Sequence, residues 1–387
     1  MEEKSREYQR CISCVLDSTD PGIEFDDVGV CNYCLNYLKT IKRLRLQFTP
    51  SLLESHIAQI KLDGKSKKYD AIVGVSGGVD SSYVLYLAVK KFGLRVLALH
   101  VDSGWDSEIA VGNIHKAIEK LGVDLYTEVI DWDEMRDIQA AFFRASVVNC
   151  DIPQDHAFRA VQYKMAKKLG IRYFVSGRNF ATDSMMPQAW VWPNHDSYHI
   201  KVIHKQFGRR KLNRFPFFSI PYFFIWLRFV ERYQDVTILN YFDYKREQAK
   251  AVVEAELGWR DYGGKHYESV FTEFYQSYYL PVKFGFDKRK AHLSGLIMNG
   301  ELSRANAIKE LEQKPFDTER IQELERYVIK KLGFTQEEWH EIMTAQPKSH
   351  DSYPNLEWIT KTLKKTKQVM VKLPFISGRK HEGAKYE

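Results

Sequence analysis

The stretch from Val73 to Ser82, VGVSGGVDSS, decides the fold. It closes the apolar run YDAIVGV and leads into SSYVLYLAVKKFG, which has a helical pattern. The runs RVLALHVD and IRYFVSG further along have the length and composition of buried strands. Strand, loop and helix built around nearly continuous Val, Ile and Leu are typical of parallel βαβ units. The sequence therefore predicts an α/β fold with a doubly wound parallel sheet.

The loop inside this stretch has the features of an anion-binding turn. The adjacent Gly77 and Gly78 let the backbone approach a charged group closely. Loop N–H groups and the N-terminus of a helix expected to begin near Ser81 or Ser82 would face that group with a favourable dipole. The hydroxyl of Ser76 adds a further donor. No Gly-Lys-Ser/Thr follows, so the loop differs from the Walker A pattern.

Polar residues also follow two other predicted strands. Asp102 closes the strand that ends in HVDSGW, and the segment SGRNFATDS follows IRYFV. Because ligands bind at the carboxyl ends of the strands in such sheets, we expect these residues at the same crevice. Asn179 and Asp183 are candidates for contacting phosphate or holding Mg²⁺. A helix cap is the alternative role for Asp102.

Four of the five cysteines lie within the first 34 residues. Cys11 and Cys14 form one CxxC pair, and Cys31 and Cys34 form a second, a pattern typical of zinc ribbons. Four thiolates complete a tetrahedral Zn²⁺ site, so the predicted metal is structural. An iron–sulfur cluster is the alternative. Cys150 stands alone and is expected to fill the core.

The composition suits a cytoplasmic protein, and its positive charge suits either an anionic substrate or weak nucleic-acid contact. The chain of 387 residues carries a net charge of +7, and its first ten residues contain no apolar signal sequence. The run Phe215 to Val230 has 16 residues with two prolines and an arginine, and a spanning helix needs about 20 apolar residues. We therefore expect no transmembrane segment and an aromatic packing surface there. A membrane-surface or partner-docking patch is the alternative, because Lys201 to Arg214 has six Lys/Arg and no acid.

Composition divides the chain into four expected parts. Residues 1–45 form the zinc ribbon, and residues 46–195 form the α/β domain. Residues 196–290 are aromatic and basic and are expected to complete the active site and contact substrate and partner. Residues 291–387 are expected to be helical with a frayed tail, with Ser303 and Thr335 as N-caps.

The string SGGVDS resembles the pyrophosphate loop of the N-type ATP pyrophosphatases. This superfamily contains asparagine, GMP and NAD synthetases and tRNA-thiolating enzymes, and it cleaves ATP between the α and β phosphates. The wider text is similar to the N-acetyl sugar amidotransferases of bacterial lipopolysaccharide O-antigen and surface-sugar biosynthesis. The similarity covers most of residues 8–315. The segments that carry it are residues 151–157, 177–190, 239–244 and 256–297.

This resemblance implies a reaction and a set of partners. The acetamido oxygen of a UDP-linked N-acetyl sugar would attack ATP to give an O-adenyl imidate, and ammonia would displace AMP to leave an acetamidino group. The resemblance also implies a separate glutaminase subunit related to histidine biosynthesis and a barrel-shaped subunit that channels ammonia. No cysteine stands at position 2, and Cys150 lacks a nucleophile context, so the chain is expected to need that partner. The aromatic stretch 215–226 is a candidate docking face, and no nucleic acid is expected.

The resemblance and the positions of the polar residues assign roles around ATP. The residues expected against the phosphates are Ser76, Gly77, Gly78, Asp80, Ser81 and Ser82. Asp102 is expected near the ribose, adenine or metal, and Gly177 and Asn179 are expected near the phosphates. Asp80 and Asp183 are the expected Mg²⁺ ligands.

Two further segments are expected to serve the acceptor and the reacting centre. The residues expected to orient the acceptor are Gln154, Asp155 and His156. Those expected at the reacting centre or on the anionic sugar are Lys265, Tyr267 and Glu268. Cations that could neutralise pyrophosphate or contact substrate are Lys265, Lys283, Lys288 and Arg289. His156 and His266 are candidate proton carriers, with a hydrogen-bonding scaffold role as the alternative.

Other functions remain open on the sequence alone. A tRNA-thiolating enzyme would share the loop and the zinc motif, but many such enzymes use further cysteines and only Cys150 is available. A net charge of +7 is also modest for a tRNA-binding protein of this size. A zinc-ribbon scaffold that binds nucleotide without turnover and an asparagine-synthetase-like enzyme are the remaining alternatives.

Overall fold

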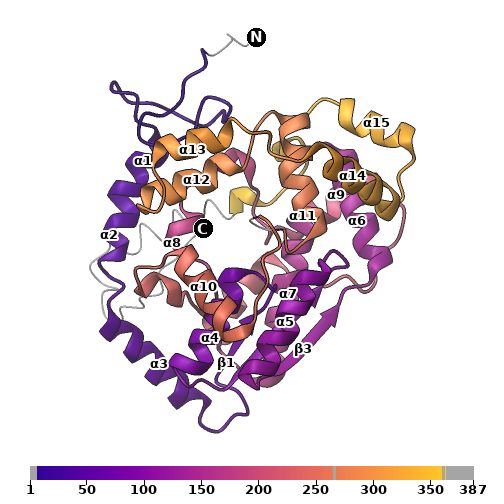
Figure 1. The fold of residues 1–387 in the computed structure, drawn as a ribbon. Coiled ribbons are helices and arrows are strands. Elements are labelled where there is room, and N and C mark those ends of the chain that lie inside the picture. Colours follow the sequence, from indigo (N-terminus) through magenta and orange to yellow (C-terminus); the bar gives the residue numbers. More distant parts are fainter. Residues whose placement is uncertain (1–6, 265–266, 360–361, 363–387) are drawn as a thin grey trace.

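The computed structural model describes residues 7–264, 267–359 and 362. Within them, five strands form one parallel sheet in the order β3-β2-β1-β4-β5 (Figure 1). The strands are β1 (Ala71–Gly74), β2 (Val96–Asp102), β3 (Asp124–Val129), β4 (Tyr173–Val175) and β5 (Gln234–Val236). This is the predicted doubly wound sheet. The strand order reverses between β1 and β4, so the crevice for a ligand lies at the carboxyl ends of these two strands.

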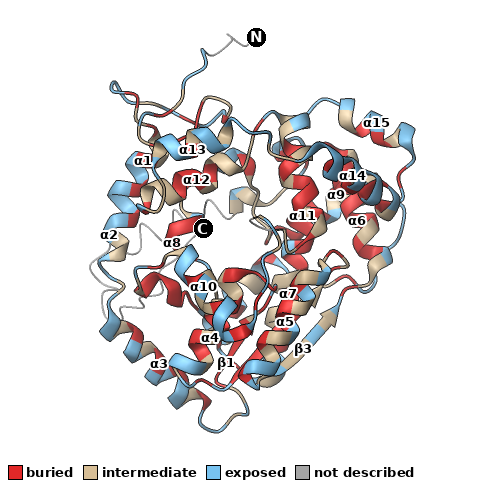
Figure 2. Ribbon diagram, in the orientation of Figure 1, coloured by how far each residue is buried: buried red, intermediate tan, exposed pale blue. Residues whose placement is uncertain are grey.

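Apolar side chains alternate between the two faces of the sheet and feed two separate cores. Ile72 and Leu97 belong to one core cluster, whereas Val73 and Ala98 belong to the other. Such alternation is what a pleated strand buried on both faces requires. Figure 2 shows buried residues on β1 and on the inner sides of the flanking helices, whereas the edge strand β3 is intermediate and exposed.

Helices precede and separate the strands. The helices between residues 50 and 257 are α3 (Pro50–Gly64), α4 (Val79–Tyr86), η2 (Leu87–Lys91), α5 (Glu108–Leu121), α6 (Trp132–Ala145), α7 (Ile152–Leu169), α8 (Phe180–Asp183), η3 (Gln188–Trp190), α9 (Ser197–Phe207), η4 (Tyr222–Val230), η5 (Ile238–Tyr241) and α10 (Arg246–Leu257). Those at the N-terminus are α1 (Asn32–Asn36), η1 (Tyr37–Ile41) and α2 (Lys42–Arg45). Those after the sheet are α11 (Val270–Phe274), η6 (Tyr275–Phe284), α12 (Arg289–Met298), α13 (Arg304–Leu311), α14 (Thr318–Leu332), α15 (Gln336–Thr344) and η7 (His350–Ser352).

Capping side chains fix several helix starts. Ser303 accepts a hydrogen bond from the N–H of Asn306, and Thr335 accepts one from the N–H of Glu338, as predicted. Helix α4 begins at Val79, earlier than the expected start at Ser81 or Ser82. The reason is the extended backbone of Gly78, with φ −78° and ψ 163°, which ends the loop directly at the helix N-cap.

Strand β5 extends the sheet beyond the expected boundary at residue 195. Its residues pair in parallel with β4, with Tyr173 opposite Gln234 and Val175 opposite Val236. The segment expected to contact substrate and partner and to complete the active site therefore also contributes to the α/β core. Val236 and the following Ile238 are buried in the same core cluster as β1.

The cysteine-bearing N-terminus packs against helices from the other end of the chain. Figure 1 shows α12 and α13 beside the N-terminal segment. The Arg304 guanidinium donates to the carbonyls of Cys11, at 2.8 Å, and Cys14, at 2.9 Å. Asp17 forms a buried ion pair with Lys290 at 2.6 Å. The ribbon and α12–α13 thus form one packed unit.

None of the helices in the described residues has both the length and the apolar character needed to cross a membrane.

Candidate functional site

The loop after β1 presents hydroxyls and a backbone N–H at the switch point of the sheet. The hydroxyls of Ser76 and Ser81 lie 3.2 Å apart, and the Gly78 N–H lies 3.3 Å from the Ser76 hydroxyl oxygen. Ser76 is exposed at this mouth, and Ser81 is half-buried. Ser82, which was expected to join them, is buried in α4. Ser76, Ser81 and the first turn of α4 therefore provide the donors for an anion.

Gly77 holds the loop in a conformation that only glycine tolerates. Its φ is +78°, and a Cβ atom would lie 2.4 Å from the Ala110 carbonyl oxygen. The Gly77 carbonyl accepts a hydrogen bond from the Trp259 indole N–H at 2.8 Å and lies 3.4 Å from the Asn113 amide nitrogen. Because the C=O and the next N–H of a trans peptide point in opposite directions, these contacts turn the Gly78 N–H toward the loop interior.

A segment from the second half of the chain covers this loop. Asn113 pairs with the backbone of Arg260 through two hydrogen bonds of 2.8 Å, one in each direction. Further along, a Cβ on Gly78 would lie 3.3 Å from the Tyr262 hydroxyl and 3.5 Å from a Glu268 carboxylate oxygen. The predicted residue Glu268 therefore lies against the loop. Trp259, Asn113 and Tyr262 were not predicted.

Asp80 lies where the loops after β1 and β4 meet. The Tyr244 hydroxyl donates a hydrogen bond to Asp80 Oδ1. Burial and then the Asp80 carboxylate raise the pKa of Tyr244, so the phenol keeps its proton and acts as a donor. A Cβ on Gly177 would lie 3.1 Å from the Asp80 Cβ, so a glycine at 177 permits this close approach. The predicted Asp80 and Gly177 are thus neighbours.

Asn179 has a different role from the expected phosphate contact. Its side-chain oxygen accepts from the Thr182 N–H at 2.9 Å, and its amide nitrogen donates to the Gly177 carbonyl at 3.0 Å. It is buried as the N-cap of α8 and shapes the loop from within. Asp183 is exposed, and its carboxylate accepts from the Asn179 N–H and the Thr182 hydroxyl, with lone pairs left over for a ligand.

Asp102 closes β2 through a turn. Its Oδ1 atom accepts from the Gly104 N–H at 2.7 Å, whereas Ser107 is the N-cap of the next helix. One residue pair that was not predicted supports the loop from this strand. His100 Nδ1 lies 3.0 Å from the Val75 carbonyl, and its Nε2 lies 3.2 Å from the Asp106 carboxylate. Burial opposes charge on His100, but Asp106 outweighs it and the pKa is raised.

The expected acceptor residues at the start of α7 separate into two groups. Gln154 accepts from the Ser103 hydroxyl at 2.9 Å and so joins α7 to the end of β2, and Asp155 is exposed. The expected role of His156 in contacting the acceptor and carrying protons is wrong. This residue is fully buried, its Nδ1 lies 2.7 Å from the Asn194 carbonyl, and its Nε2 accepts from the Phe218 N–H. Burial lowers its pKa to about 4, so it is a neutral scaffold residue without access to substrate.

Lys288 interacts electrostatically with carboxylates at the start of α7. Asp151 Oδ1 is buried without a hydrogen-bond partner among the described residues. Burial and the nearby Asp155 raise the pKa of Asp151 to about 7, and Lys288 opposes that rise. The Lys288 ammonium also lies 5.7 Å from the centre of the Tyr275 ring. The predicted Asp155 and Lys288 therefore belong to one cluster.

Two other expected cations serve the C-terminal helices. Arg289 binds Asp287 at 2.7 Å and the Gln313 carbonyl at 2.9 Å, so its expected contact with substrate is replaced by structural ones. Lys283 donates to the carbonyls of Ile342 and Ala345. Tyr267 is half-buried, and burial raises its pKa. The expected Lys265 and His266 lie outside the described residues.

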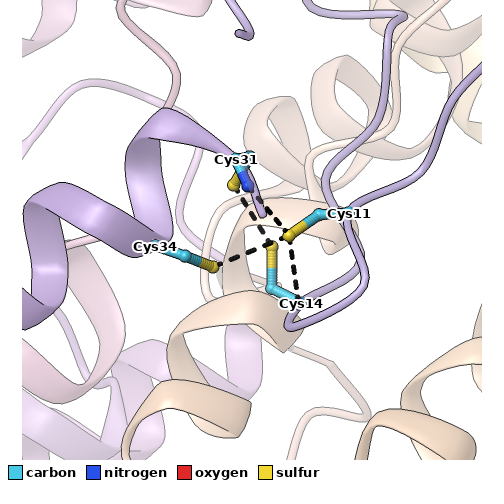
Figure 3. Close-up of side chains that lie close together, drawn as sticks. All are labelled: Cys11, Cys14, Cys31 and Cys34. Atoms are coloured by element: carbon cyan, nitrogen blue, oxygen red, sulfur yellow. Dashed lines mark hydrogen bonds between the residues drawn. The ribbon is translucent and has the colours of Figure 1, made fainter. Parts of the chain in front are cut away.

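The four predicted cysteines meet in one cluster (Figure 3). The Sγ atoms of Cys11 and Cys34 lie 3.9 Å apart, those of Cys14 and Cys31 lie 3.7 Å apart, and all four are buried. Tetrahedral zinc with Zn–S bonds of about 2.3 Å requires sulfur separations of about 3.8 Å, so the geometry fits this ion. A four-iron cluster would place its own atoms between the sulfurs and hold them further apart. The Cys31 N–H also approaches Cys11 Sγ at 3.2 Å, which favours a thiolate there.

Two family models match separate parts of the chain. Residues 56–179 match the model described as NAD synthase, and residues 268–367 match the one described as LPS biosynthesis protein WbpG-like, C-terminal domain. The first contains the loop, Asp80 and Asp102. The second begins at Glu268, where the covering segment reaches the loop.

Similar whole proteins are distant. An uncharacterized protein of Methanocaldococcus jannaschii, MJ1599, is 22% identical over 83% of this chain and 99% of its own. A glutamine-hydrolyzing GMP synthase of Pyrobaculum aerophilum is 34% identical over 23% of this chain and 18% of its own.

Two solved structures have low scores against this one. NMN synthetase from Francisella tularensis shows 20% identity and a TM-score of 0.27 over 35% of this chain and 56% of its own. NH3-dependent NAD synthetase from Campylobacter jejuni shows 16% identity and a TM-score of 0.28 over 52% of this chain and 82% of its own. The fold assignment rests on the strand order of this chain. Its matched segments are those of an ATP-utilising, NAD-synthase-like domain followed by a WbpG-like domain, which supports ligase-type chemistry.

Proposed function

We propose that the protein is an AMP-forming amidotransferase that converts the acetamido group of a nucleotide-linked N-acetyl sugar to an acetamidino group. The observation that carries this proposal is the loop at the switch point. It combines a glycine-only turn at Gly77, the inward N–H of Gly78 and the hydroxyls of Ser76 and Ser81. The match of the surrounding segment to NAD synthase supports cleavage of ATP between its α and β phosphates.

The first step uses the loop to accept charge. The acetamido oxygen forms a bond to the α-phosphorus of ATP, and the bond from that phosphorus to the bridging oxygen breaks. Pyrophosphate leaves with the bonding electrons. The Ser76 and Ser81 hydroxyls and the N-terminus of α4 are positioned to donate to its oxygens.

The second step replaces oxygen by nitrogen. Ammonia forms a bond to the imidate carbon, the carbon–oxygen bond to AMP breaks, and the nitrogen loses a proton to leave the amidine. Asp155, an exposed carboxylate in the first turn of α7, is the proposed acceptor of that proton. Lys288, which acts on the same Asp151 carboxyl as Asp155, is the proposed cation for the negative charge of the departing AMP.

Mg²⁺ is the metal that this chemistry requires, and two carboxylates fit it. Asp80 and Asp183 come from the two loops that meet at Gly177, and oxygen atoms are the ligands that Mg²⁺ prefers. When bound, the ion would neutralise phosphate charge and orient the β and γ groups. Asp80 would keep its hydrogen bond from Tyr244, which fixes the carboxylate in place.

The acceptor class and the ammonia source form the finer part of the proposal. The WbpG-like match supports a substrate of lipopolysaccharide biosynthesis, and a UDP-linked N-acetyl sugar in the cytoplasm is the proposed acceptor. Ammonia would come from a separate glutaminase related to histidine biosynthesis, with a barrel-shaped partner as its channel. Cys150 supports this division, because it is fully buried and burial raises the pKa of its thiol.

The deciding experiment is mass spectrometry of UDP-linked N-acetyl sugars incubated with protein, ATP, Mg²⁺ and ammonium. We expect the small mass loss that follows when NH replaces O, with AMP and pyrophosphate in equal amounts. Asp80→Asn is the matched variant, because it removes the carboxylate charge at nearly constant volume and should abolish both products. Formation of ADP and orthophosphate instead would refute the proposal. Replacing ammonium by glutamine should stop turnover until a glutaminase is added.

Thiolation of tRNA is the less favoured function. Persulfide chemistry needs an accessible cysteine beyond the zinc ligands, and the fifth cysteine, Cys150, is inaccessible. A sulfur donor should therefore fail to stimulate AMP release, whereas ammonium should succeed.

A further inference from the structure

Helix η4 exposes an apolar face that no other described segment of the chain covers. Ile225, Trp226, Phe229 and Val230 are exposed by 57%, 44%, 66% and 53%. Ile225 and Phe229, like Trp226 and Val230, are four residues apart, which is close to one turn of a π-helix, so the two adjacent pairs lie on one side of it. Exposed apolar side chains that gather in this way on one element mark a contact surface. We call these four residues the η4 face.

The opposite side of the same helix anchors it to the protein. Leu227 is buried, and the Phe223 ring stacks on His195 with centroids 5.0 Å apart. Phe223 also packs at 6.2 Å from Tyr163 on α7. The helix is therefore held along its inner side, and the η4 face is presented outward on a fixed element.

The charge around the η4 face is positive. Between Ser197 and Val230 the sequence has seven Lys/Arg and no Asp or Glu. Arg228 and Arg232, at the end of the helix, are exposed and form no ion pair with other described residues. The Lys167 ammonium on α7 lies 5.8 Å from the centre of the Trp226 ring.

Acidic groups near this surface are already engaged. Glu231 accepts from the Trp226 indole N–H at 2.9 Å and lies 3.9 Å from Lys167. Asp235 forms an ion pair with Arg178. What the surface offers to an approaching partner is therefore apolar side chains bordered by cations.

We infer that the η4 face binds the surface of a bilayer that carries anionic lipids. Its Trp and Phe rings would enter the headgroup region, where amphipathic aromatic rings are favoured, and Arg228, Arg232 and Lys167 would meet the negative headgroups. The helix has 9 residues, so it would lie in the interface without spanning. Exposed Trp and Phe rings bordered by cations match the interface of an anionic bilayer, and a lipid surface is therefore the proposed occupant. This inference concerns a surface away from the phosphate loop and does not depend on the proposed reaction.

The test is co-sedimentation of the full chain with vesicles of two compositions. One is phosphatidylcholine, and the other is an equal mixture of phosphatidylcholine and phosphatidylglycerol. We expect binding to the mixture only, weakening as salt is raised, with a blue shift of tryptophan fluorescence as Trp226 leaves water.

Matched variants identify the surface. The double variant Ile225→Ser with Phe229→Ser should lower partitioning about tenfold or more. Leu46→Ser with Leu62→Ser removes apolar residues exposed by 79% and 65% elsewhere and should leave partitioning unchanged. Arg228→Glu should lower partitioning on the order of tenfold, whereas Lys61→Glu, with the same change of charge on α3, should have little effect.

Three results would overturn the inference. The first is equal binding of the wild type to both kinds of vesicle, and the second is equal binding by the wild type and the η4 double variant. The third is a wild type that ignores vesicles; a lower oligomeric mass of the double variant in analytical ultracentrifugation would then identify the face as a protein interface. Unchanged circular dichroism and melting temperature show that the variants fold. AMP formation in a lipid-free assay should stay at the wild-type level, which separates this test from that of the reaction.

Discussion

Gly77 has a positive φ, and the Ala110 backbone leaves no room for a Cβ at this position. Both constraints fix the conformation of the phosphate loop. Gly77→Ala should cost about 1–3 kcal/mol in the free energy of unfolding and lower AMP formation about a hundredfold, because the loop donors move. The measurements are urea unfolding and AMP release. Gly122→Ala is the control, since Gly122 has φ +63° but nothing within 4 Å of an added Cβ. Gly122→Ala should lose stability through backbone strain and keep its activity. Equal losses of activity in the two variants would contradict the role given to Gly77.

Trp259 orients the loop from a distance through its hydrogen bond to the Gly77 carbonyl. In Trp259→Phe a smaller aromatic ring replaces the indole and the N–H donor is lost, at a cost of about 1–2 kcal/mol for the hydrogen bond. We expect KM for ATP to rise about tenfold with a smaller change in kcat. Trp339→Phe loses an equivalent bond, from its indole to Glu325 at 2.8 Å, far along the chain. That variant should lose similar stability and keep its KM, and a shared rise in KM would sink the prediction.

The local sequence identified the loop residues but not what holds them. Ser76 to Asp80 could be predicted because glycines, hydroxyls and a strand-to-helix junction are adjacent in the chain. Trp259 could not, because an indole reaching a carbonyl 182 residues away leaves no local pattern. Conversely, His156 and Asn179 have polar side chains suited to an active site. Residue type does not reveal direction, and both bond inward to the backbone.

At the scale of elements, bound zinc should stabilise the cysteine cluster and, through it, the packed helices α12–α13. Purified protein should contain equimolar zinc. Removing it with a chelator should lower the melting temperature and cost on the order of several kcal/mol. Cys34→Ser should behave in the same way, whereas Cys150→Ser, which replaces another buried thiol, should retain the metal. Elemental analysis measures the zinc content and thermal melts measure the stability. A zinc-free, fully stable wild type would contradict the assignment of a zinc site.

Elements with strong apolar patterns were predictable, and short or polar ones were not. β1 begins with Ala-Ile-Val and β2 with Val-Leu-Ala-Leu, so the sequence indicated them directly. β5 is Gln-Asp-Val, and it becomes a strand because β4 offers an open edge. Only tertiary pairing reveals such an element. The N-caps at Ser303 and Thr335 were predictable because capping is local.

At the scale of the whole molecule, stability should fall as the solution becomes acidic. Burial holds the pKa of His156 at about 4, below its usual 6.5, so the folded state prefers the neutral ring. The contribution of this shifted pKa to the free energy of unfolding is complete above pH 6.5. It is lost as pH falls toward 4, an effect on the order of 3 kcal/mol. Urea unfolding at pH 7.5 and pH 5 should show a smaller difference for His156→Gln than for the wild type. The exposed His115→Gln should match the wild type, and an unchanged difference in His156→Gln would refute this account.

The long reach from Trp259 to Gly77 also governs when the protein becomes competent during synthesis. Strands β1 to β4 leave the ribosome well before the covering segment does, so a nascent chain can pair them while its phosphate loop is still unsupported. Nucleotide affinity should therefore arise late in translation, after residue 259 has emerged. Chains stalled before that point should be unable to bind or consume ATP.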